Sequence, residues 1–384
     1  MKISDSIKFV GVNDKKIDLF EGQFKVQNGM SYNSYLIIDE KIAVMDSVDK
    51  NFGDEWLSNI KNELNGKSPD FLVVQHMEMD HSANILSFAN AFPSAKIVSS
   101  KMAFNMMASY FGTDFADRQI VVAEGSVLDL GNHKLNFIAA PNVHWPEVIM
   151  TYEETEKILF SADGFGKFGA LDKDEDWLSE ARRYYFGIVG KFGANVQAVL
   201  KKAANLKIDK ICPLHGPVLD SNVEYYIEKY STWSSYTPET KGIFIPYTSV
   251  YGNTKKVVQK LEKSLVEKGA ENVLTFDLAR GDIYEAVSKA FEYSTVIFAT
   301  TTYNTGIFPF MREFITDLKE RNFQNRRVGF IENSSWAPMA IRTMNSMLEN
   351  SKDLTYLENN ISIKIAPNDK TDSLIEAMAD ELLK

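Results

Sequence analysis

Cysteine is nearly absent from this chain of 384 residues, in which Cys212 is the only one. An intramolecular disulfide is therefore impossible, and so is a cysteine-ligated iron–sulfur or rubredoxin-type centre built within the chain. Cys212 stands three residues before His215, a spacing that could ligate a metal. We expect instead a small buried side chain, because Cys212 lies in an apolar run.

Long apolar runs and clustered positive charge are also missing. No run approaches the ~20 residues that a membrane-spanning helix requires, and the N-terminus has no signal-like apolar region, so we expect a cytoplasmic protein. The net charge is -10, with acidic and basic residues interspersed, which argues against a nucleic-acid-binding surface. The length and the 45% of apolar residues predict a globular protein of two domains.

Histidine is rare, with five in the chain, yet two of them lie in the segment Gln75-His76-Met77-Glu78-Met79-Asp80-His81. The apolar run before it, residues 71–74, predicts a buried strand. Imidazole and carboxylate ligands together suit zinc, iron or manganese rather than magnesium or calcium. The segment therefore predicts a catalytic metal centre, with a polar surface loop as the alternative.

Three further metal-competent side chains follow predicted strands. His144 follows residues 135–139, Asp163 follows residues 158–161, and His215 follows residues 208–211. Since functional residues gather on the loops at strand ends, this placement indicates a shared site. His133 lies in a predicted turn, and we expect it at the surface.

The order of the predicted elements changes along the chain. Residues 1–240 mix strands and helices, with a β-hairpin around Asp39-Glu40, and residues 237–240 predict a linker. From residue 241 to 384, five strands alternate with five helices, which predicts a doubly wound parallel sheet. The chief helices expected in the first domain are residues 54–63, 83–92, 101–110, 180–192 and 193–204.

Polar loops follow the first, third and fourth strands of the second domain, and the first of them leads into a helix N-terminus suited to phosphate. This loop has no G-K-[ST] string, so a monophosphate ester fits better than a nucleoside triphosphate; an N-capped helix after a polar turn is the alternative. Tyr303 and Trp336 could form aromatic walls for a flat ring. The predicted binding residues are Thr248, Ser249, Val250, Tyr251, Gly252, Asn253, Thr254, Thr302, Tyr303, Asn304, Thr305, Gly306, Ser334, Ser335, Trp336 and Ala337.

The series His76-x-Glu78-x-Asp80-His81, then His144, Asp163 and His215, resembles the ligand set of the metallo-β-lactamase fold, an αβ/βα sandwich. Zinc hydrolases of that fold have histidine where this chain has Glu78, and a carboxylate there makes a harder, more anionic site that suits iron. The loops S-x-Y-G-N-T and E-N-x-S-W-A-P resemble those of flavodoxin-like domains. Across its whole length the chain resembles the flavodiiron proteins.

The resemblance implies a non-haem diiron pair and FMN. One iron would be held by His76, Glu78 and His144 and the other by Asp80, His81 and His215, with Asp163 bridging. The implied activity is reduction of dioxygen to water, of nitric oxide to nitrous oxide, or both, with electrons relayed through FMN. The resemblance also implies a head-to-tail homodimer or a dimer of dimers. Glu147-Val148 departs from the Asp-Ser that we expect after His144-Trp145-Pro146.

The electron source has to be external on this interpretation. Residues 164–169 form a G-x-G-x-x-G string after a strand, but a charge run, residues 171–176, follows instead of an amphipathic helix, so we reject an NAD(P)H fingerprint. A rubredoxin or a reductase system is the donor that the resemblance implies, and some relatives accept reduced F420. A zinc hydrolase fused to a flavodoxin module, and an electron carrier without a metal site, are the competing hypotheses.

Overall fold

The computed structural model describes residues 2–173 and 175–384; Met1 and Asp174, the latter within the charge run noted above, lie outside the described residues. The chain divides into two compact units, the first ending at Ser231 and the second beginning at Thr232. The domain boundary at residues 240/241 stays a prediction. Each unit is described by itself below.

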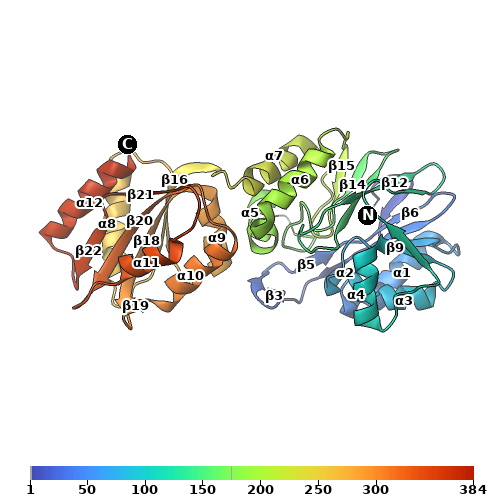
Figure 1. The fold of residues 1–384 in the computed structure, drawn as a ribbon, viewed down its shortest axis with the longest axis horizontal. Helices are drawn as coiled ribbons and strands as arrows, with labels where there is room; N and C mark the ends of the chain where they lie inside the picture. Colours follow the sequence, from blue (N-terminus) through green and yellow to red (C-terminus); the bar gives the residue numbers. More distant parts are fainter. Residues whose placement is uncertain (1, 174) are drawn as a thin grey trace. The chain divides into compact units, whose positions relative to one another are not determined.

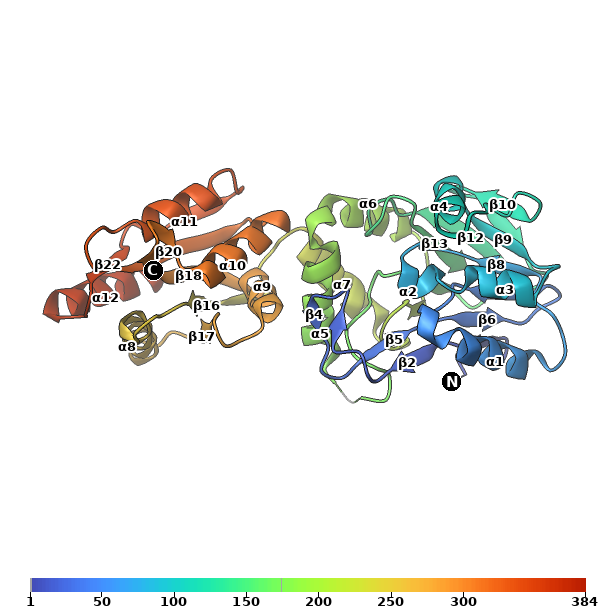
Figure 2. The same ribbon diagram turned by 90° about the horizontal axis from the view of Figure 1, so that it is seen from below.

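The first unit is built on two β-sheets (Figures 1 and 2). One has the strand order β1-β6-β7-β8-β9-β10 and the other the order β11-β12-β13-β14-β15, while β2 pairs with β5 and β3 with β4. The first sheet and the small pairs comprise β1 (Ile7–Phe9), β2 (Val12–Asp14), β3 (Leu19–Phe20), β4 (Phe24–Lys25), β5 (Met30–Tyr32), β6 (Tyr35–Ile37), β7 (Ala43–Met45), β8 (Phe71–Val73), β9 (Lys96–Ser100) and β10 (Gln119–Val122). The second sheet comprises β11 (Val127–Asp129), β12 (Lys134–Ala139), β13 (Ile149–Glu153), β14 (Ile158–Phe160) and β15 (Lys210–Cys212).

The two sheets share one apolar core. Val73 and Val98 of the first sheet and Phe137 and Phe160 of the second are buried in the same cluster of contacting side chains. Because successive side chains of a strand point to opposite faces, each sheet contributes alternate residues to this core. Cys212 belongs to the same cluster and is fully buried, which confirms the expectation of a small buried side chain.

The helices of the first unit form two groups, with α1, α3 and α4 beside the first sheet and α5, α6 and α7 beside the second (Figures 1 and 2). They are a 3₁₀ turn (Lys50–Phe52), α1 (Gly53–Leu64), α2 (Met79–Ser82), α3 (Ile85–Ala91), α4 (Lys101–Phe111), α5 (Trp177–Tyr184), α6 (Gly193–Ala203) and α7 (Val223–Ser234). The helix predicted over residues 180–192 is interrupted, since a π-helical turn (Tyr185–Val189) and a 3₁₀ turn (Gly190–Phe192) follow α5. Gly187 lies in the π-helical turn, and Phe24 packs close to it, since an added Cβ there would lie 2.8 Å from the Phe24 ring.

The second unit is the predicted doubly wound sheet, with the strand order β17-β16-β18-β20 and β22 pairing parallel to β20. The five predicted strands are confirmed, and two short ones, β19 and β21, were not predicted. The strands are β16 (Thr240–Tyr247), β17 (Val273–Asp277), β18 (Tyr293–Tyr303), β19 (Gly306–Ile307), β20 (Arg326–Ser334), β21 (Leu354–Tyr356) and β22 (Ile361–Lys364). The helices are α8 (Asn253–Glu267), α9 (Ile283–Glu292), α10 (Pro309–Glu320), α11 (Ala340–Leu348) and α12 (Asp369–Leu382).

Helices α8 and α12 cover the same face of this sheet. Val258 and Leu261 of α8 and Met378 of α12 are buried in one cluster with Ile297 and Ile331 of the sheet. The apolar residues of α8 recur every three or four positions and so lie on one face of the helix, and this face packs against the sheet. Among the described residues, no helix has both the length and the apolar content needed to cross a membrane.

The expectation that His133 lies at the surface is wrong. Only 5% of the residue is exposed, and its Nδ1 lies 2.9 Å from Oε1 of Glu153. Glu153 is fully buried at the end of β13 and also accepts hydrogen bonds from the backbone N–H groups of Thr155 and Glu156. Because a buried carboxylate needs donors, the turn folds His133 inward to supply one.

We predict that Leu261→Ala lowers the free energy of unfolding of the second unit by about 2–5 kcal/mol, because the change leaves a cavity in a fully buried part of α8. Hydrogen exchange measured through a denaturant series resolves the two units. The control is Val266→Ala on the exposed side of the same helix, which should change stability by less than about 0.5 kcal/mol. An equal loss of hydrogen-exchange protection in β12, which belongs to the first unit, would contradict the view that the two units have independent cores.

Candidate metal centre and phosphate-binding loops

The structure brings all the predicted metal ligands together in two groups. In each group the ligand atoms lie within 4.8 Å of one another. The first group is His76, Glu78, His144 and Asp163, and the second is Asp80, His81 and His215. Their elements explain the meeting, because β8, β12, β14 and β15 end shortly before these residues and the short helix α2 carries Asp80 and His81.

In the first group two imidazoles converge on two carboxylates. Nε2 of His76 lies 3.3 Å from Oε2 of Glu78 and 3.1 Å from Oδ2 of Asp163. Nε2 of His144 lies 3.0 Å from the same Glu78 oxygen and 3.3 Å from the same Asp163 oxygen. Four ligand atoms therefore face one small space.

In the second group the nitrogens of two imidazoles face each other. Nε2 of His81 lies 3.0 Å from Nε2 of His215, and these atoms lie 3.4 Å and 3.2 Å from Oδ2 of Asp80. Two nitrogens that bind one ion at about 2.1 Å lie about 3.0–3.4 Å apart for bond angles between 90° and 110°. The spacing suits a shared metal ion.

Asp163 faces both groups with different oxygens. Its Oδ2 lies beside His76 and His144, whereas its Oδ1 lies 3.5 Å from Nε2 of His215. The residue is 1% exposed and lies three residues after the end of β14, so the loop backbone limits its position. A carboxylate in this position can bridge two metal ions.

The carboxylate oxygens fit metal binding better than hydrogen bonding. Among the described residues, neither oxygen of Asp80 and neither oxygen of Asp163 has a hydrogen-bond partner, although all four are buried. Buried carboxylates without donors are costly unless a cation neutralises them. Four imidazoles and three carboxylates make a donor set of the kind that zinc, iron and manganese prefer.

Two of the imidazoles are held in orientation by hydrogen bonds from Nδ1, the ring nitrogen that does not face the group. Nδ1 of His76 donates to Oε1 of Glu147 at 2.8 Å, and Nδ1 of His215 donates to the backbone oxygen of Ser31 at 2.7 Å. With the proton held on Nδ1, each ring directs the lone pair of Nε2 toward its group. Glu147 also accepts from the backbone N–H of Met77 at 2.9 Å, so it holds the ligand segment at two points.

Burial and the neighbouring carboxylates shift the pKa values of the imidazoles in both groups. Burial disfavours the charged imidazole of His144, but the carboxylates of Asp163 and Glu78 outweigh burial and raise its pKa to about 9. The same carboxylates, with Glu147, hold the pKa of His76 above its usual value against burial. Burial lowers the pKa of His81 to about 4, whereas Asp80 and Asp163 outweigh burial and raise the pKa of His215. Each group therefore has at least one imidazole that favours a proton, which a metal ion would have to displace.

Aromatic rings surround the imidazoles, and one side stays open. Trp145 packs against His76 and Tyr184 against His215, with ring centroids 5.3 Å and 5.6 Å apart. An open pocket of about 510 Å³ reaches the first group, and its lining includes Glu21 and Gly187 together with Glu78 and His144. The pocket gives small molecules access to the ligand atoms from solvent.

Glu21 and the role of Glu147 were not found from the sequence. Glu21 lies in the turn between β3 and β4, and nothing in the sequence links that hairpin to residues 76–81. Glu147 drew attention only as a departure from the expected Asp-Ser. Its extra methylene does not prevent contact, because the side chain still reaches His76.

The three polar loops of the second unit lie at one edge of its sheet. Residues 248–254 run from the end of β16 into the first turn of α8, residues 302–306 turn from β18 into β19, and residues 334–337 begin at the last residue of β20. Strands β16, β18 and β20 are parallel neighbours, so their carboxyl ends are adjacent. This is the edge at which doubly wound sheets bind ligands.

Several groups in these loops suit a phosphate ester with a flat ring. Gly252 precedes α8 as its N-cap, and the Oγ1 atoms of Thr254 and Thr301 are buried without a hydrogen-bond partner among the described residues. A helix N-terminus with nearby hydroxyl donors favours a phosphate. Tyr251 and Trp336 are 93% and 89% exposed and offer aromatic faces.

Two family models match the chain. The "ODP family beta lactamase" model matches residues 30–216, and a "Flavodoxin domain" model matches residues 244–356. The anaerobic nitric oxide reductase flavorubredoxin of Escherichia coli O1:K1 / APEC is 28% identical over 361 residues, which cover 91% of this chain and 75% of that protein.

Solved structures are similar over the whole chain. The flavodiiron protein from Giardia intestinalis superposes with a TM-score of 0.92 at 24% identity, covering 100% of this chain and 95% of that one. The rubredoxin oxygen:oxidoreductase from Desulfovibrio gigas gives 0.91 at 25% identity, covering 100% and 97%. The predicted combination of a lactamase-like and a flavodoxin-like fold is confirmed.

We predict that Glu147→Gln weakens metal binding about 10–100-fold, because the neutral amide is a weaker partner for Nδ1 of His76 than a carboxylate is. Competition with a chelator of known affinity measures the change. The control is Glu63→Gln in α1, an exposed position away from the ligands. Unchanged affinity in Glu147→Gln would mean that the orientation of His76 does not depend on Glu147.

Proposed function

Because the chain belongs to the flavodiiron proteins, we propose that it is an oxidoreductase that reduces dioxygen to water, nitric oxide to nitrous oxide, or both. The observation that carries the proposal is the position of Asp163, whose two oxygens face separate groups of ligands. Such an arrangement suits a pair of metal ions, and a single-metal hydrolase would not need it.

We propose two non-haem irons as the metals. His76, Glu78 and His144 would hold one, Asp80, His81 and His215 would hold the other, and Asp163 would bridge them. Bound iron supplies electrons one at a time together with open positions for a small ligand. Glu78 favours iron over the zinc hydrolase alternative, because it places a carboxylate among the imidazoles of the first group.

We propose FMN as the flavin of the second unit. The N-terminus of α8 and the hydroxyl of Thr254 would bind its phosphate, and residues 302–306 and 334–337 would contact the ring. Bound FMN supplies two electrons at a time. Reduction of dioxygen to two waters takes four electrons, which matches one reduced flavin and two ferrous ions.

The protein's own residues would control access to the metals and the orientation of the ligands. The open pocket that reaches Glu78 and His144 admits a diatomic molecule, while the rings of Trp145 and Tyr184 limit water around the imidazoles. Glu147 and the backbone of Ser31 would keep His76 and His215 in ligating orientation. A dry, oriented site favours completing the reduction before partly reduced species leave.

All proposed metal ligands precede Ser231 and all proposed flavin-binding residues follow Thr232, so electrons have to pass between units. We propose the head-to-tail dimer of the family, in which the FMN of one chain serves the irons of its partner. We also propose an external donor, either rubredoxin or a reductase system. The support is the chain's single cysteine and its lack of a credible dinucleotide fingerprint.

We predict that Asp163→Asn lowers iron content and turnover but leaves FMN bound, because it removes the bridging charge from only one unit. Thr254→Ala should do the reverse, weakening FMN while iron stays in place. Metal analysis and flavin absorbance of the purified variants measure both effects.

The matched control for the first variant is Asp117→Asn, an exposed aspartate of the same unit. Purified wild-type protein should carry about two irons and one FMN per chain, as the ligand groups imply. Stoichiometric zinc, together with no gas reduction by iron-supplied protein, would support the hydrolase alternative.

We predict that NADH alone supports little oxygen or nitric oxide reduction by the isolated protein. Adding a rubredoxin and its reductase should restore rapid turnover, measured with an oxygen or nitric oxide electrode. Rapid consumption with NADH alone would mean that the chain holds a dinucleotide site, and residues 164–169 would be the first place to test.

We predict that two inactive variants complement each other in mixed dimers. His215→Ala removes a metal ligand, and Thr254→Glu places a negative charge where the phosphate would bind. In a head-to-tail dimer, the FMN of the first variant would face the intact irons of the second. Mixed dimers, made by co-expressing both variants and purified by a different tag on each chain, should therefore regain activity. Activity no higher than that of either parent would show that electrons pass within one chain.

A further inference from the structure

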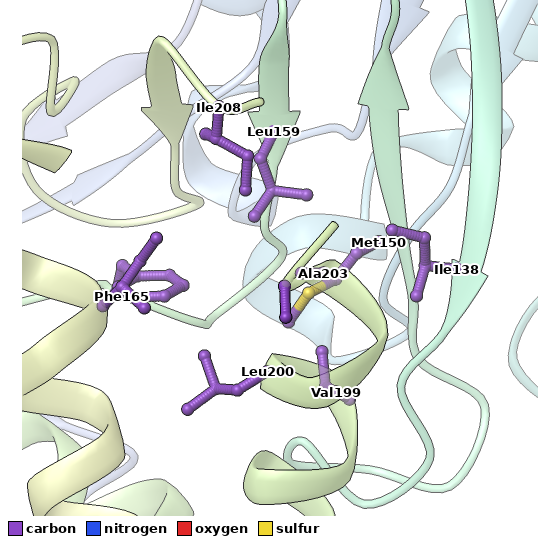
Figure 3. A pocket seen from close by; sticks show the side chains of 10 residues that line it. Ile138, Met150, Leu159, Phe165, Val199, Leu200, Ala203 and Ile208 are labelled. Carbon is purple, nitrogen blue, oxygen red and sulfur yellow. The ribbon is translucent and has the colours of Figure 1, made fainter. Parts of the chain in front are cut away.

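An apolar pocket that opens partly to the surface lies in the first unit, between the second sheet and helices α6 and α7; it is called the cavity below. Its volume is about 110 Å³, and all ten lining residues are apolar. Met150 and Leu159 come from the sheet, Val199 and Ala203 from α6, Ile227 from α7, and Phe165 from the loop after β14. Figure 3 shows the side chains of the sheet and of α6 directed toward a common space.

Water is a poor occupant of this cavity. A buried water needs two to four polar partners, and no lining side chain carries a nitrogen, an oxygen or a charge. An engineered apolar cavity of about 150 Å³ stays dry and binds benzene or xenon. The cavity described here is smaller, so it suits xenon and diatomic gases better than an aromatic ring.

The cavity and the metal centre share one loop as a wall. Asp163 and Phe165 are two residues apart, so the same loop carries a proposed ligand and a lining side chain. At Gly164, an added Cβ would lie 3.0 Å from the terminal methyl of Met150, which lines the cavity. At Gly166, an added Cβ would lie 3.5 Å from Cβ of His215. The loop therefore contacts the cavity wall at one glycine and a ligand at the next.

We propose that this cavity binds small apolar gases and holds dioxygen or nitric oxide beside the metal centre. The identity of the gas rests on the function proposed above, whereas the binding of an apolar gas rests on the cavity alone. Nonpolar molecules leave water for an apolar space, which raises their local concentration. Met150, with its flexible thioether chain, lies between the cavity and Gly164 and is the side chain whose rotation would open a way to the loop.

The first test is xenon binding. Diffraction from crystals of the whole protein under xenon pressure should show a xenon atom between Met150, Val199 and Ala203. This measurement does not depend on iron, flavin or an electron donor. A cavity without xenon, while other apolar sites of the same crystal fill, would overturn the proposal.

The second test fills the cavity. Ala203→Leu should abolish xenon binding and raise the half-saturating concentration of the gas several-fold, with kcat and iron and FMN content unchanged. Ile227→Phe fills the space from α7 and provides an independent variant if Ala203→Leu disturbs folding. The matched control is Ala198→Leu, the same change at an exposed position of α6 that does not line the cavity.

The outcomes separate the two proposals. Loss of xenon with an unchanged half-saturating concentration would overturn the role of the cavity in gas supply. A lower kcat with an unchanged half-saturating concentration would also overturn it, because the filled cavity would then act on a later step. If wild-type protein binds xenon but reduces neither gas, the proposed function fails and the cavity remains an apolar gas site.

Discussion

The structure of the first unit depends on one buried carboxylate, that of Asp163, which lies between two sets of imidazoles. Removing an ionised carboxylate from water costs several kcal/mol unless charges of opposite sign compensate it. The fold meets this requirement by ending β8, β12, β14 and β15 around the same space. Under the function proposed above, two metal ions would supply the remaining charge, one in each group of ligands.

The second unit also gathers its candidate binding residues from loops at strand ends, but on a doubly wound parallel sheet. The carboxyl ends of parallel strands lie at one edge of the sheet. Loops that are far apart in the sequence therefore become neighbours because of the strand order alone. A phosphate there needs only a helix N-terminus and hydroxyl groups, which the first βα connection supplies. Each unit thus forms its candidate site from loops at strand ends, and neither site uses cysteine.

Much of this was predictable because strand ends can be recognised locally. An apolar run followed by a ligand-rich loop identified His76 and its neighbours, and strand–helix alternation identified the parallel sheet. The remainder depends on contacts between distant residues. The inward turn of His133 follows from the buried Glu153, the close packing of Phe24 on Gly187 from the fold of the β3–β4 hairpin, and the place of Glu21 from the same hairpin. Sequence periodicity carries no information about such partners.

Anomalous X-ray diffraction from crystals of protein purified with its native metals tests the central claim most directly. Data collected just above and just below the iron absorption edge locate each iron and distinguish it from zinc. The account predicts two iron peaks per chain on opposite sides of the Asp163 carboxylate, one beside His76 and His144 and one beside His81 and His215. A single peak, or peaks that show no change across the iron edge, would contradict it.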